Sequence, residues 1–431
     1  MQSEYRPIRV ALLGAGSVGA QVARLLIENR EELAKRVGAE LQLVGVAVRD
    51  TKAKRGAEIP QDLITSDAES ILTGADIVIE LMGGIDPAYD LIKKALNSGA
   101  DVITANKALI AAKGNELIDL AQQLGAQLYY EAAVGGAIPI IRPLRESLAG
   151  DKINRVMGIV NGTTNYILDQ MDSKNVDFQS ALKEAQVLGY AEADPTADIE
   201  GFDAASKAAI LASLAFHSDV PVEKVHREGI TSITSAQIQT ARQAGYALKL
   251  LAIGERVDQG LVVRVHPTLI PLNHPLAAVR GAYNAVFVEA ESAGRLMFYG
   301  AGAGGKQTAS AVLGDLVSAA KRHLAGGPGL ASSTHANLNV LPVQSTRTRF
   351  QITLRVSDQP GVLASIAGEF AAQNISVETV AQSVPGDGEP AAVLTIMTHI
   401  ASEGDLEKVV ESISKNKAVV SVESVLRVEG I

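Results

Sequence analysis

The chain has 431 residues, of which 47% are hydrophobic and 20% are charged, and its formal net charge is −9. This size allows two to three domains with buried cores, which excludes a largely disordered protein, and no apolar run approaches the ~20 residues of a membrane span. The acidic balance argues against a nucleic-acid partner, and the absence of cysteine excludes disulfides, thiolate metal sites and thiol nucleophiles.

Short apolar segments alternate with helical segments over residues 1–150. Strands are predicted at 8–13, 41–48, 76–81 and 101–104, and helices at 19–36, 90–98 and 114–124. Strands that alternate with crossover helices indicate an α/β fold with a doubly wound parallel sheet of the Rossmann type. We expect a helix at 303–325 to complete this NAD(P)-binding domain.

A glycine-rich motif follows the first predicted strand and opens a helix. It consists of Gly14, Ala15, Gly16, Ser17, Val18 and Gly19. The first glycine permits a tight turn, the second lets backbone amides approach a pyrophosphate, and the third allows close packing of helix on strand. The motif therefore predicts a dinucleotide site; a glycine turn without a ligand is the alternative.

The second predicted strand ends in a basic segment. Arg49 precedes Asp50, and Lys52, Lys54 and Arg55 follow. In nicotinamide enzymes an acidic residue at this place binds the ribose hydroxyls of NAD, whereas an arginine accommodates the 2′-phosphate of NADP. Arg49 therefore favours NADP, and Asp50 keeps NAD as the alternative.

The regular alternation of strands and helices ends after residue 150. An α+β region over 151–302 contains a predicted strand at 156–160, a strong helix at 203–216 and strands near 262–265 and 285–289. We interpret this region as a substrate-binding and dimerisation domain. Residues 326–347, rich in glycine and polar residues, indicate a linker. Residues 348–431 have the order βαββαβ of a ferredoxin-like domain.

Four short motifs occur together in one order. They are Thr104-Ala105-Asn106-Lys107, Glu131-Ala132-Ala133-Val134-Gly135-Gly136, Asn161-Gly162-Thr163-Thr164-Asn165 and Gly201-Phe202-Asp203-Ala204-Ala205-Ser206-Lys207. Each is modest alone, but the set closely resembles homoserine dehydrogenase, from the first strand to about residue 325. The resemblance implies reversible hydride transfer between L-homoserine and L-aspartate 4-semialdehyde, in the synthesis of threonine, methionine and isoleucine.

The resemblance also assigns the site residues. Lys207 would give the proton to the aldehyde oxygen, and Lys107 would bind substrate and cofactor beside it. Glu192 would hold the substrate ammonium group, although Asp194 and Asp198 compete for that role on sequence alone. Asp203, one helical turn before Lys207, would orient the substrate or a lysine; a surface ion pair is the alternative reading of these two residues.

In the resembled family, the loop that begins at Glu131 wraps a monovalent cation, usually sodium. The matching ligands here are Glu131, Val134, Gly136 and Ile138, and such oxygen donors suit a hard ion. A plain turn is the alternative. Gly302, in the later glycine-rich segment, would close over the nicotinamide. The family usually has proline where this chain has Gln307, which affects the local turn and leaves the proton chemistry unchanged.

Residues 348–431 resemble an ACT domain. Pro360 and Gly361 form a tight turn that exposes amides at the start of a helix, where a carboxylate can bind. The resemblance implies feedback by threonine, and assembly as a homodimer or homotetramer; an oligomerisation module without a ligand is the alternative. Residues 1–7 are polar and lack an apolar secretion region, so a cytoplasmic location is predicted.

Two rival functions remain open on sequence alone. One is another Rossmann reductase acting on a related aldehyde, which a substrate panel would separate. The other is a non-enzymatic regulator that senses cofactor and amino acid. Two lysines in the predicted site argue against the regulator, because a sensor has no need of them.

Overall fold

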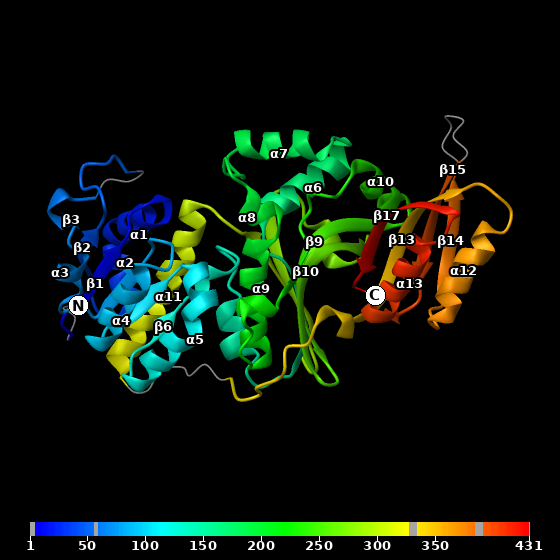
Figure 1. Cartoon of the computed structure of the whole chain (residues 1–431). Helices are drawn as coiled ribbons and strands as arrows, with labels where there is room; N and C mark the ends of the chain where they lie inside the picture. The colour runs from blue at the N-terminus through cyan, green and yellow to red at the C-terminus, as the bar shows by residue number, and fades with distance from the viewer. Residues whose placement is uncertain (1–4, 56–58, 327–333, 384–390, 431) are drawn as a thin grey trace. The chain divides into compact units, whose positions relative to one another are not determined.

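The computed structural model describes residues 5–55, 59–326, 334–383 and 391–430 (Figure 1). The chain forms two compact units, each built from segments that are separate in the sequence. The first unit comprises 1–162, 206–222 and 283–338. The second comprises 163–205, 223–282 and 339–431.

The first unit is organised around a parallel sheet of six strands. They are β1 (Ile8–Leu13), β2 (Leu41–Ala47), β3 (Ile64–Thr65), β4 (Ile77–Glu80), β5 (Asp101–Thr104) and β6 (Leu128–Tyr129). Their order is β3-β2-β1-β4-β5-β6, and every neighbouring pair is parallel. This is the Rossmann order, in which ligands bind where the strand order reverses, between β1 and β4. The predicted doubly wound sheet is confirmed.

Helices pack against this sheet. They are α1 (Ser17–Glu28), α2 (Arg30–Val37), α3 (Ala68–Leu72), α4 (Ala88–Asn97), α5 (Lys107–Gln123) and α11 (Gly305–Ala325). The single helix predicted at 19–36 is two helices, because Asn29 ends α1 and begins α2 with a non-helical backbone. Val312 and Leu316 of α11 are fully buried in the same core as Val10 and Leu12 of β1. A late segment of the chain thus completes the first unit's core.

An antiparallel group of strands also belongs to the first unit. It has the order β12-β11-β7, with β7 at Ile153–Ile159, β11 at Tyr283–Ala290 and β12 at Gly294–Ala301. After β7 the chain enters α6 (Gly162–Lys174), and α9 (Phe202–Phe216) crosses from the second unit into the first. The end of β7 and the middle of α9 therefore lie in one unit.

The second unit contains a long hairpin. Strands β9 (Tyr246–Val257) and β10 (Gly260–Pro271) pair antiparallel over their full length, and β8 (His226–Arg227) pairs with β10. The other helices of this part are α7 (Phe178–Val187), α8 (Thr196–Ile199) and α10 (Ser235–Gln243). The sequence indicated only residues 262–265 of this hairpin, because both strands are almost continuously buried and show no alternation.

The C-terminal part of the second unit has the predicted βαββαβ order, with a two-residue strand added. Its elements are β13 (Arg347–Ser357), α12 (Val362–Ala372), β14 (Val377–Ser383), β15 (Ala391–Thr398), β16 (Ala401–Ser402), α13 (Glu403–Ser414) and β17 (Val419–Val428). The sheet order β17-β13-β15-β14 is that of a ferredoxin-like domain. Strand β17 also pairs parallel with β10, at Thr268 with Arg427 and Leu269 with Val428.

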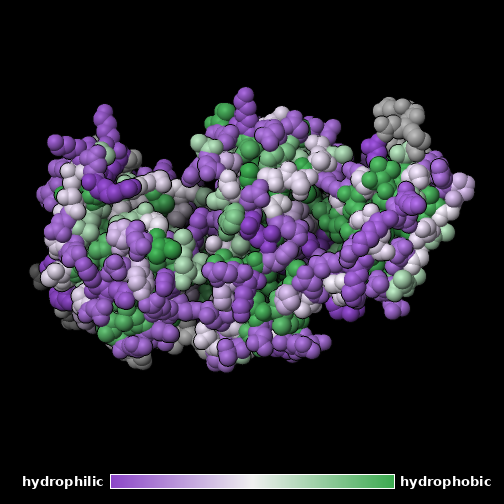
Figure 2. Space-filling model, in the orientation of Figure 1, coloured by the Kyte–Doolittle hydropathy of each residue, from purple (hydrophilic) through white to green (hydrophobic). Residues whose placement is uncertain are grey.

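Hydrophilic residues cover much of the face shown in Figure 2, with smaller hydrophobic groups between them. Within the described ranges, no helix combines the length and the apolar character that a bilayer crossing requires.

Candidate active site

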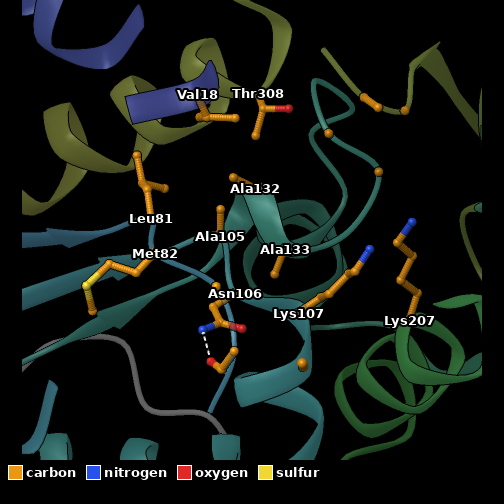
Figure 3. A pocket seen from close by; sticks show the side chains of 17 residues that line it. Val18, Leu81, Met82, Ala105, Asn106, Lys107, Ala132, Ala133, Lys207 and Thr308 are labelled. Carbon is orange, nitrogen blue, oxygen red and sulfur yellow. Dashed lines mark hydrogen bonds between the residues drawn. The ribbon is translucent and has the colours of Figure 1, made fainter. Parts of the chain in front are cut away.

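A pocket of about 370 Å³ lies in the first unit, beyond the ends of β4 and β5 (Figure 3). Most of its lining is glycine and alanine, including Gly83, Gly84, Ala105, Ala132, Ala133 and Gly302. Lys107 and Lys207 are the ionisable side chains among the described residues that line it. The pocket therefore offers close backbone approach together with two amines.

The glycine-rich motif has the geometry expected of a dinucleotide turn. Gly14 has φ +95°, and a Cβ there would stand 2.7 Å from the Leu81 carbonyl oxygen. A Cβ on Gly19 would stand 2.0 Å from the Gly14 carbonyl oxygen, so both positions require glycine. At Gly16 a Cβ would meet nothing within 4 Å, so its surface is open. The first and third glycines thus pack the turn, and the second is open to a ligand.

Helix α1 begins at Ser17, and Val18 lines the pocket. Arg49 is exposed, two residues after β2 ends. The carboxylate of Asp50 accepts a hydrogen bond from the Lys52 amide at 2.8 Å, and Arg55 donates to the Asp50 carbonyl. Asp50 is thus engaged within its own turn, and Arg49 stands at the rim of the sheet.

Lys107 owes its position to the cap of α5. The side chain of Asn106 accepts a hydrogen bond from the Leu109 amide at 3.2 Å and donates to the Gly84 carbonyl. This side chain therefore caps α5 and fastens it to the loop after β4. Lys107 is consequently the first helical residue, and its side chain lines the pocket.

Lys207 enters the pocket from α9. It is 8% exposed, and its Nζ donates to the carbonyl oxygen of Val160 at 2.7 Å. Figure 3 shows Lys107 and Lys207 extending from different helices with their amines turned in the same direction. The pocket thus joins five of the site residues predicted from sequence, which are Val18, Lys107, Gly136, Lys207 and Gly302.

The other predicted polar residues belong to the second unit. Asp203 is 6% exposed and lies in the first turn of α9, one turn before Lys207. Glu192 is exposed in the loop between α7 and α8, and its carbonyl accepts from Gln186. Hydrogen bonds from Thr196 lower the pKa of Asp194, which is thereby tied to its own loop.

The carboxylate of Glu131 organises the loop that was predicted to bind a cation. It is 3% exposed and accepts hydrogen bonds from the amides of residues 140, 141 and 142 at 2.6, 2.7 and 2.9 Å. Within the described chain, no group of three or more histidine or acidic side chains is placed to hold a metal. The predicted cation ligands, Glu131, Val134, Gly136 and Ile138, stay a prediction.

Asp315 of α11 lies directly beside this loop. It accepts the Glu131 amide at 2.9 Å and the Arg142 guanidinium at 2.6 Å. Burial outweighs the attraction of Arg142 and raises the pKa of Asp315 to about 6. Nothing in the local sequence indicates a role for Asp315, because its partners are 173 or more positions away.

Glu80 was also missed. It ends β4 and is fully buried, and it accepts from the Met82 amide at 2.7 Å and the Thr104 hydroxyl at 2.6 Å. It thereby fixes the loop that lines the pocket after β4. A glutamate at the end of an otherwise apolar strand was a usable signal, since a buried carboxylate requires partners.

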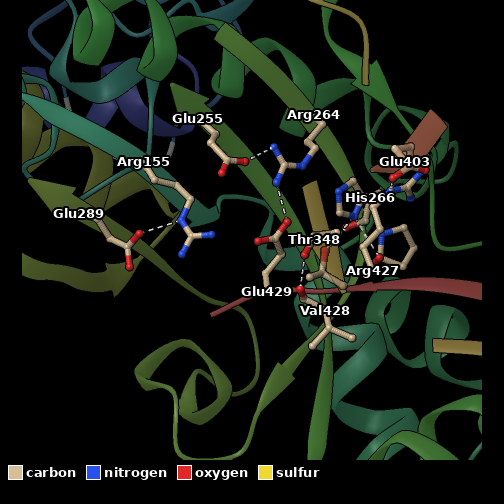
Figure 4. A network of polar contacts seen from close by, with 12 residues as sticks. Arg155, Glu255, Arg264, His266, Glu289, Thr348, Glu403, Arg427, Val428 and Glu429 are labelled. Carbon is tan, nitrogen blue, oxygen red and sulfur yellow. Dashed lines mark hydrogen bonds and ion pairs between the residues drawn. The ribbon is translucent and has the colours of Figure 1, made fainter. Parts of the chain in front are cut away.

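A second cluster of buried charge lies in the second unit, at the junction of β10 and β17 (Figure 4). Arg264 of β10 is fully buried and forms ion pairs with Glu255 at 2.8 Å and Glu429 at 2.5 Å. Arg427 of β17 pairs with Glu228 at 2.9 Å and with Glu403. The predicted ACT region is thus fastened to the hairpin by paired charges.

The Pro360–Gly361 turn borders a cavity of its own. This cavity measures about 370 Å³ and is lined by residues that include Asp358, Gln359, Gly361 and Gln382. Gly361 has φ +91° and directly precedes α12. The turn therefore stands at a helix N-terminus, as the sequence predicted.

The chain matches three family models. Residues 14–131 match the NAD-binding domain of homoserine dehydrogenase, residues 139–317 match homoserine dehydrogenase, and residues 350–418 match the ACT domain. A curated homoserine dehydrogenase of Corynebacterium glutamicum is 50% identical over 429 residues, which cover 98% of this chain and 96% of that protein.

Solved structures agree with these matches. A homoserine dehydrogenase from Thiobacillus denitrificans has a TM-score of 0.92 and 40% identity, with 98% of each chain covered. A hyperthermophilic archaeal homoserine dehydrogenase mutant in complex with NADPH has a TM-score of 0.61 and 27% identity, covering 75% of this chain and 99% of that one. These matches cover almost the whole chain, and the chain therefore belongs to the homoserine dehydrogenase family of NAD(P)-dependent oxidoreductases and carries a C-terminal ACT domain.

Proposed function

We propose that this enzyme interconverts L-homoserine and L-aspartate 4-semialdehyde at the pocket lined by Lys107 and Lys207, with Lys207 as the proton donor and acceptor. The observation that carries the proposal is the placement of the Lys207 amine, buried and hydrogen-bonded to the Val160 carbonyl, at the edge of a glycine-lined pocket. Rossmann enzymes bind their ligands at this end of the sheet.

The reaction divides between the cofactor and the chain. A bound nicotinamide supplies hydride to the aldehyde carbon in the reductive direction. Lys207 gives a proton to the carbonyl oxygen, so that aldehyde, hydride and proton together yield the alcohol; in the oxidative direction it takes the hydroxyl proton. The Val160 carbonyl holds the Lys207 amine in place, and Asp203 orients the substrate or the lysine from the same helix.

Binding of the amino-acid substrate requires charges of both signs. Lys107 is the proposed partner of substrate and cofactor, since its side chain lines the pocket beside Lys207. Glu192 is the proposed partner of the ammonium group, because an unpaired ammonium in a closed site is costly. Asp194 is already bonded to Thr196, which favours Glu192 over that alternative.

The proposed cofactor is NADP. Arg49 stands exposed beyond β2, where a guanidinium can pair with a 2′-phosphate. The archaeal relative in complex with NADPH supports this choice. NAD remains the alternative through Asp50.

A monovalent cation, sodium, is the second proposed ligand. The donors would be carbonyls of the loop that carries Val134, Gly136 and Ile138, and hard oxygen donors fit such an ion. A bound cation would fix this glycine-rich loop beside the pocket. Dialysis against a sodium-free buffer should lower the melting temperature, and sodium should restore it.

The ACT domain is proposed to bind threonine at the cavity beside Gly361 and thereby to inhibit the enzyme. We place the activity in threonine, methionine and isoleucine biosynthesis, in the cytoplasm, and expect a homodimer or homotetramer. The support for an effector is the cavity at the α12 N-terminus. Absence of threonine binding to the full chain would contradict this part.

The decisive experiment is spectrophotometric. Purified enzyme receives L-homoserine with NAD or NADP in parallel, with and without threonine, beside the Lys207→Ala variant. We expect turnover with NADP, inhibition by threonine, and severe loss of turnover in the variant while NADPH binding survives. Equal turnover in wild type and variant would refute the role of Lys207.

A further inference from the structure

Asn284 of β11 is a buried amide whose two polar atoms lack a hydrogen-bond partner within the described structure. It is 1% exposed, and neither Oδ1 nor Nδ2 is bonded. A buried amide without partners is destabilising, and native proteins rarely keep one without a reason. Asn284 therefore needs an explanation beyond packing.

The surroundings of Asn284 connect it to the pocket. A Cβ on Gly302 would stand 2.1 Å from the Asn284 amide, so the side chain fills the space that any other residue at 302 would need. Gly302 itself lines the pocket. A Cβ on Gly136 would in turn stand 2.5 Å from the Gly302 carbonyl oxygen. The Asn284 amide therefore packs directly against Gly302, and the Gly302 backbone packs directly against Gly136.

Asn284 also lies next to the anchor of Lys207. Strands β7 and β11 pair up to Ile159 with Ala285. One residue further, each strand reaches Val160 and Asn284, and the Val160 carbonyl accepts the Lys207 amine. Asn284 is therefore adjacent both to the strand end that holds the proton donor and to the glycine loop at the pocket.

We infer that Asn284 is a positioning residue for the Gly300–Gly304 segment. When the nicotinamide occupies the pocket, this segment takes a position in which its backbone hydrogen-bonds the Asn284 amide. The Asn284 amide, which has no partner among the described residues before the cofactor binds, then forms hydrogen bonds with the backbone of this segment. These bonds exist only in the cofactor complex, so they tighten cofactor binding. The inference rests on the proposed placement of the nicotinamide in this pocket.

The test compares stability and cofactor binding in one variant. Asn284→Leu keeps the branched shape and removes the polar atoms, so the free enzyme should melt no lower than wild type. The Kd for NADPH, measured by fluorescence with NADH in parallel, should rise about tenfold, since the bonds to the loop are lost. If leucine prevents folding, Asn284→Ala allows the same two measurements.

Asn165→Leu is the matched control for stability. Its amide is equally buried, but it donates to Gly281 at 2.8 Å and accepts from Lys249 at 3.1 Å. This variant should therefore melt below wild type.

The outcomes separate the two proposals. If Asn284→Leu lowers the melting temperature as Asn165→Leu does and leaves the Kd unchanged, Asn284 is a structural residue and the inference fails alone. If the wild-type enzyme binds neither NADPH nor NADH, the placement of the cofactor fails first and takes the inference with it.

Discussion

Positive charge is buried both at the pocket and at the β10–β17 junction, but the cations have different partners in the two places. At the junction, Arg264 is fully buried between two carboxylates, and Arg427 has two more. The described lining of the pocket combines two lysines with glycine and alanine and includes no carboxylate. Lys207 donates there to a neutral carbonyl.

The difference teaches what each region is built for. At the junction each buried charge is paired with an opposite charge. Removal of one member of a pair would leave the other charge buried and uncompensated, so the pairs hold β10 and β17 in their observed pairing. Where amines border an open space lined by glycine, the arrangement is the one expected of the proposed ligand site. Four variants can break or sharpen this comparison.

The largest effect is expected at Lys207. Lys207→Met should lower kcat roughly 10²–10⁴-fold, the usual contribution of general acid–base catalysis, while the NADPH Kd is retained. Lys249 is a matched control, because it is a buried lysine outside the pocket lining, with its pKa lowered to about 8 by burial. Lys249→Met should keep most of its turnover per folded molecule. Comparable loss in both variants would remove the distinction between the two lysines.

Arg264→Met tests the junction. The variant leaves Glu429 and Glu255 without their buried partner, so the free energy of unfolding should fall by about 3–5 kcal/mol in urea titrations of the full chain. Arg295→Met is the control, since that exposed guanidinium pairs with Glu289 at 3.4 Å and should cost below about 1 kcal/mol. Similar small losses in both would show that the buried pairs stabilise little.

Asp315 combines features of both regions, because it is paired with the cationic Arg142 and yet burial has the larger effect on its pKa. Its folded pKa, about 6, is above the ordinary value of 3.8, so its contribution to stability is present below about pH 4 and is lost as pH rises to 6 and beyond. The loss amounts to roughly 2–3 kcal/mol.

The measurement is the melting temperature of wild type and Asp315→Asn between pH 4.5 and 7. The asparagine stays neutral, so the variant should lose less stability than wild type over this range. Absolute stability is not the readout, because the variant also loses its ion pair with Arg142. Parallel curves for the two proteins would mean that Asp315 is ionised throughout.

The smallest effect is expected at the rim of the sheet. Arg49→Ala should raise the KM for NADPH about tenfold and leave the KM for NADH unchanged, because only the 2′-phosphate would lose a charged partner. Arg36→Ala removes the same charge from α2 and should change neither constant. Equal changes for both cofactors would assign Arg49 to general electrostatics.

The parallel sheet and the ferredoxin-like domain were predictable because both follow local patterns, whereas the two-residue strands β3 and β6 were not predicted. Glycines at 14, 16 and 19 mark the turn after β1, and alternating strands and helices specify a parallel sheet. The break at Asn29 was not predicted, since the apolar spacing continues through it. The hairpin β9–β10 was missed in part, because strands buried on both faces lose the alternation that reveals them.

The two lysines of the candidate site were predictable from sequence, whereas the buried carboxylates near it were harder to predict. Lys107 and Lys207 stand in distinctive motifs, and both line the pocket. Asp315 acts through partners far away in the sequence, and no local spacing indicates such partners. Glu80 bonds the nearby Met82 amide, so its place at the end of an apolar strand could have indicated it. Cofactor preference, the cation and the effector stay predictions until they are measured.

Strand β17 follows every other described strand in the sequence, yet it lies between β10 and β13. During synthesis, the part of β10 at Thr268 and Leu269 lacks its β17 partner until the chain has been made as far as residue 428. Exposed strand edges recruit other chains, and domains tend to fold in the order of their synthesis. Nascent or truncated forms that lack the ten residues of β17 should consequently aggregate more than the full chain, so completion of the ACT-domain sheet would also protect the hairpin.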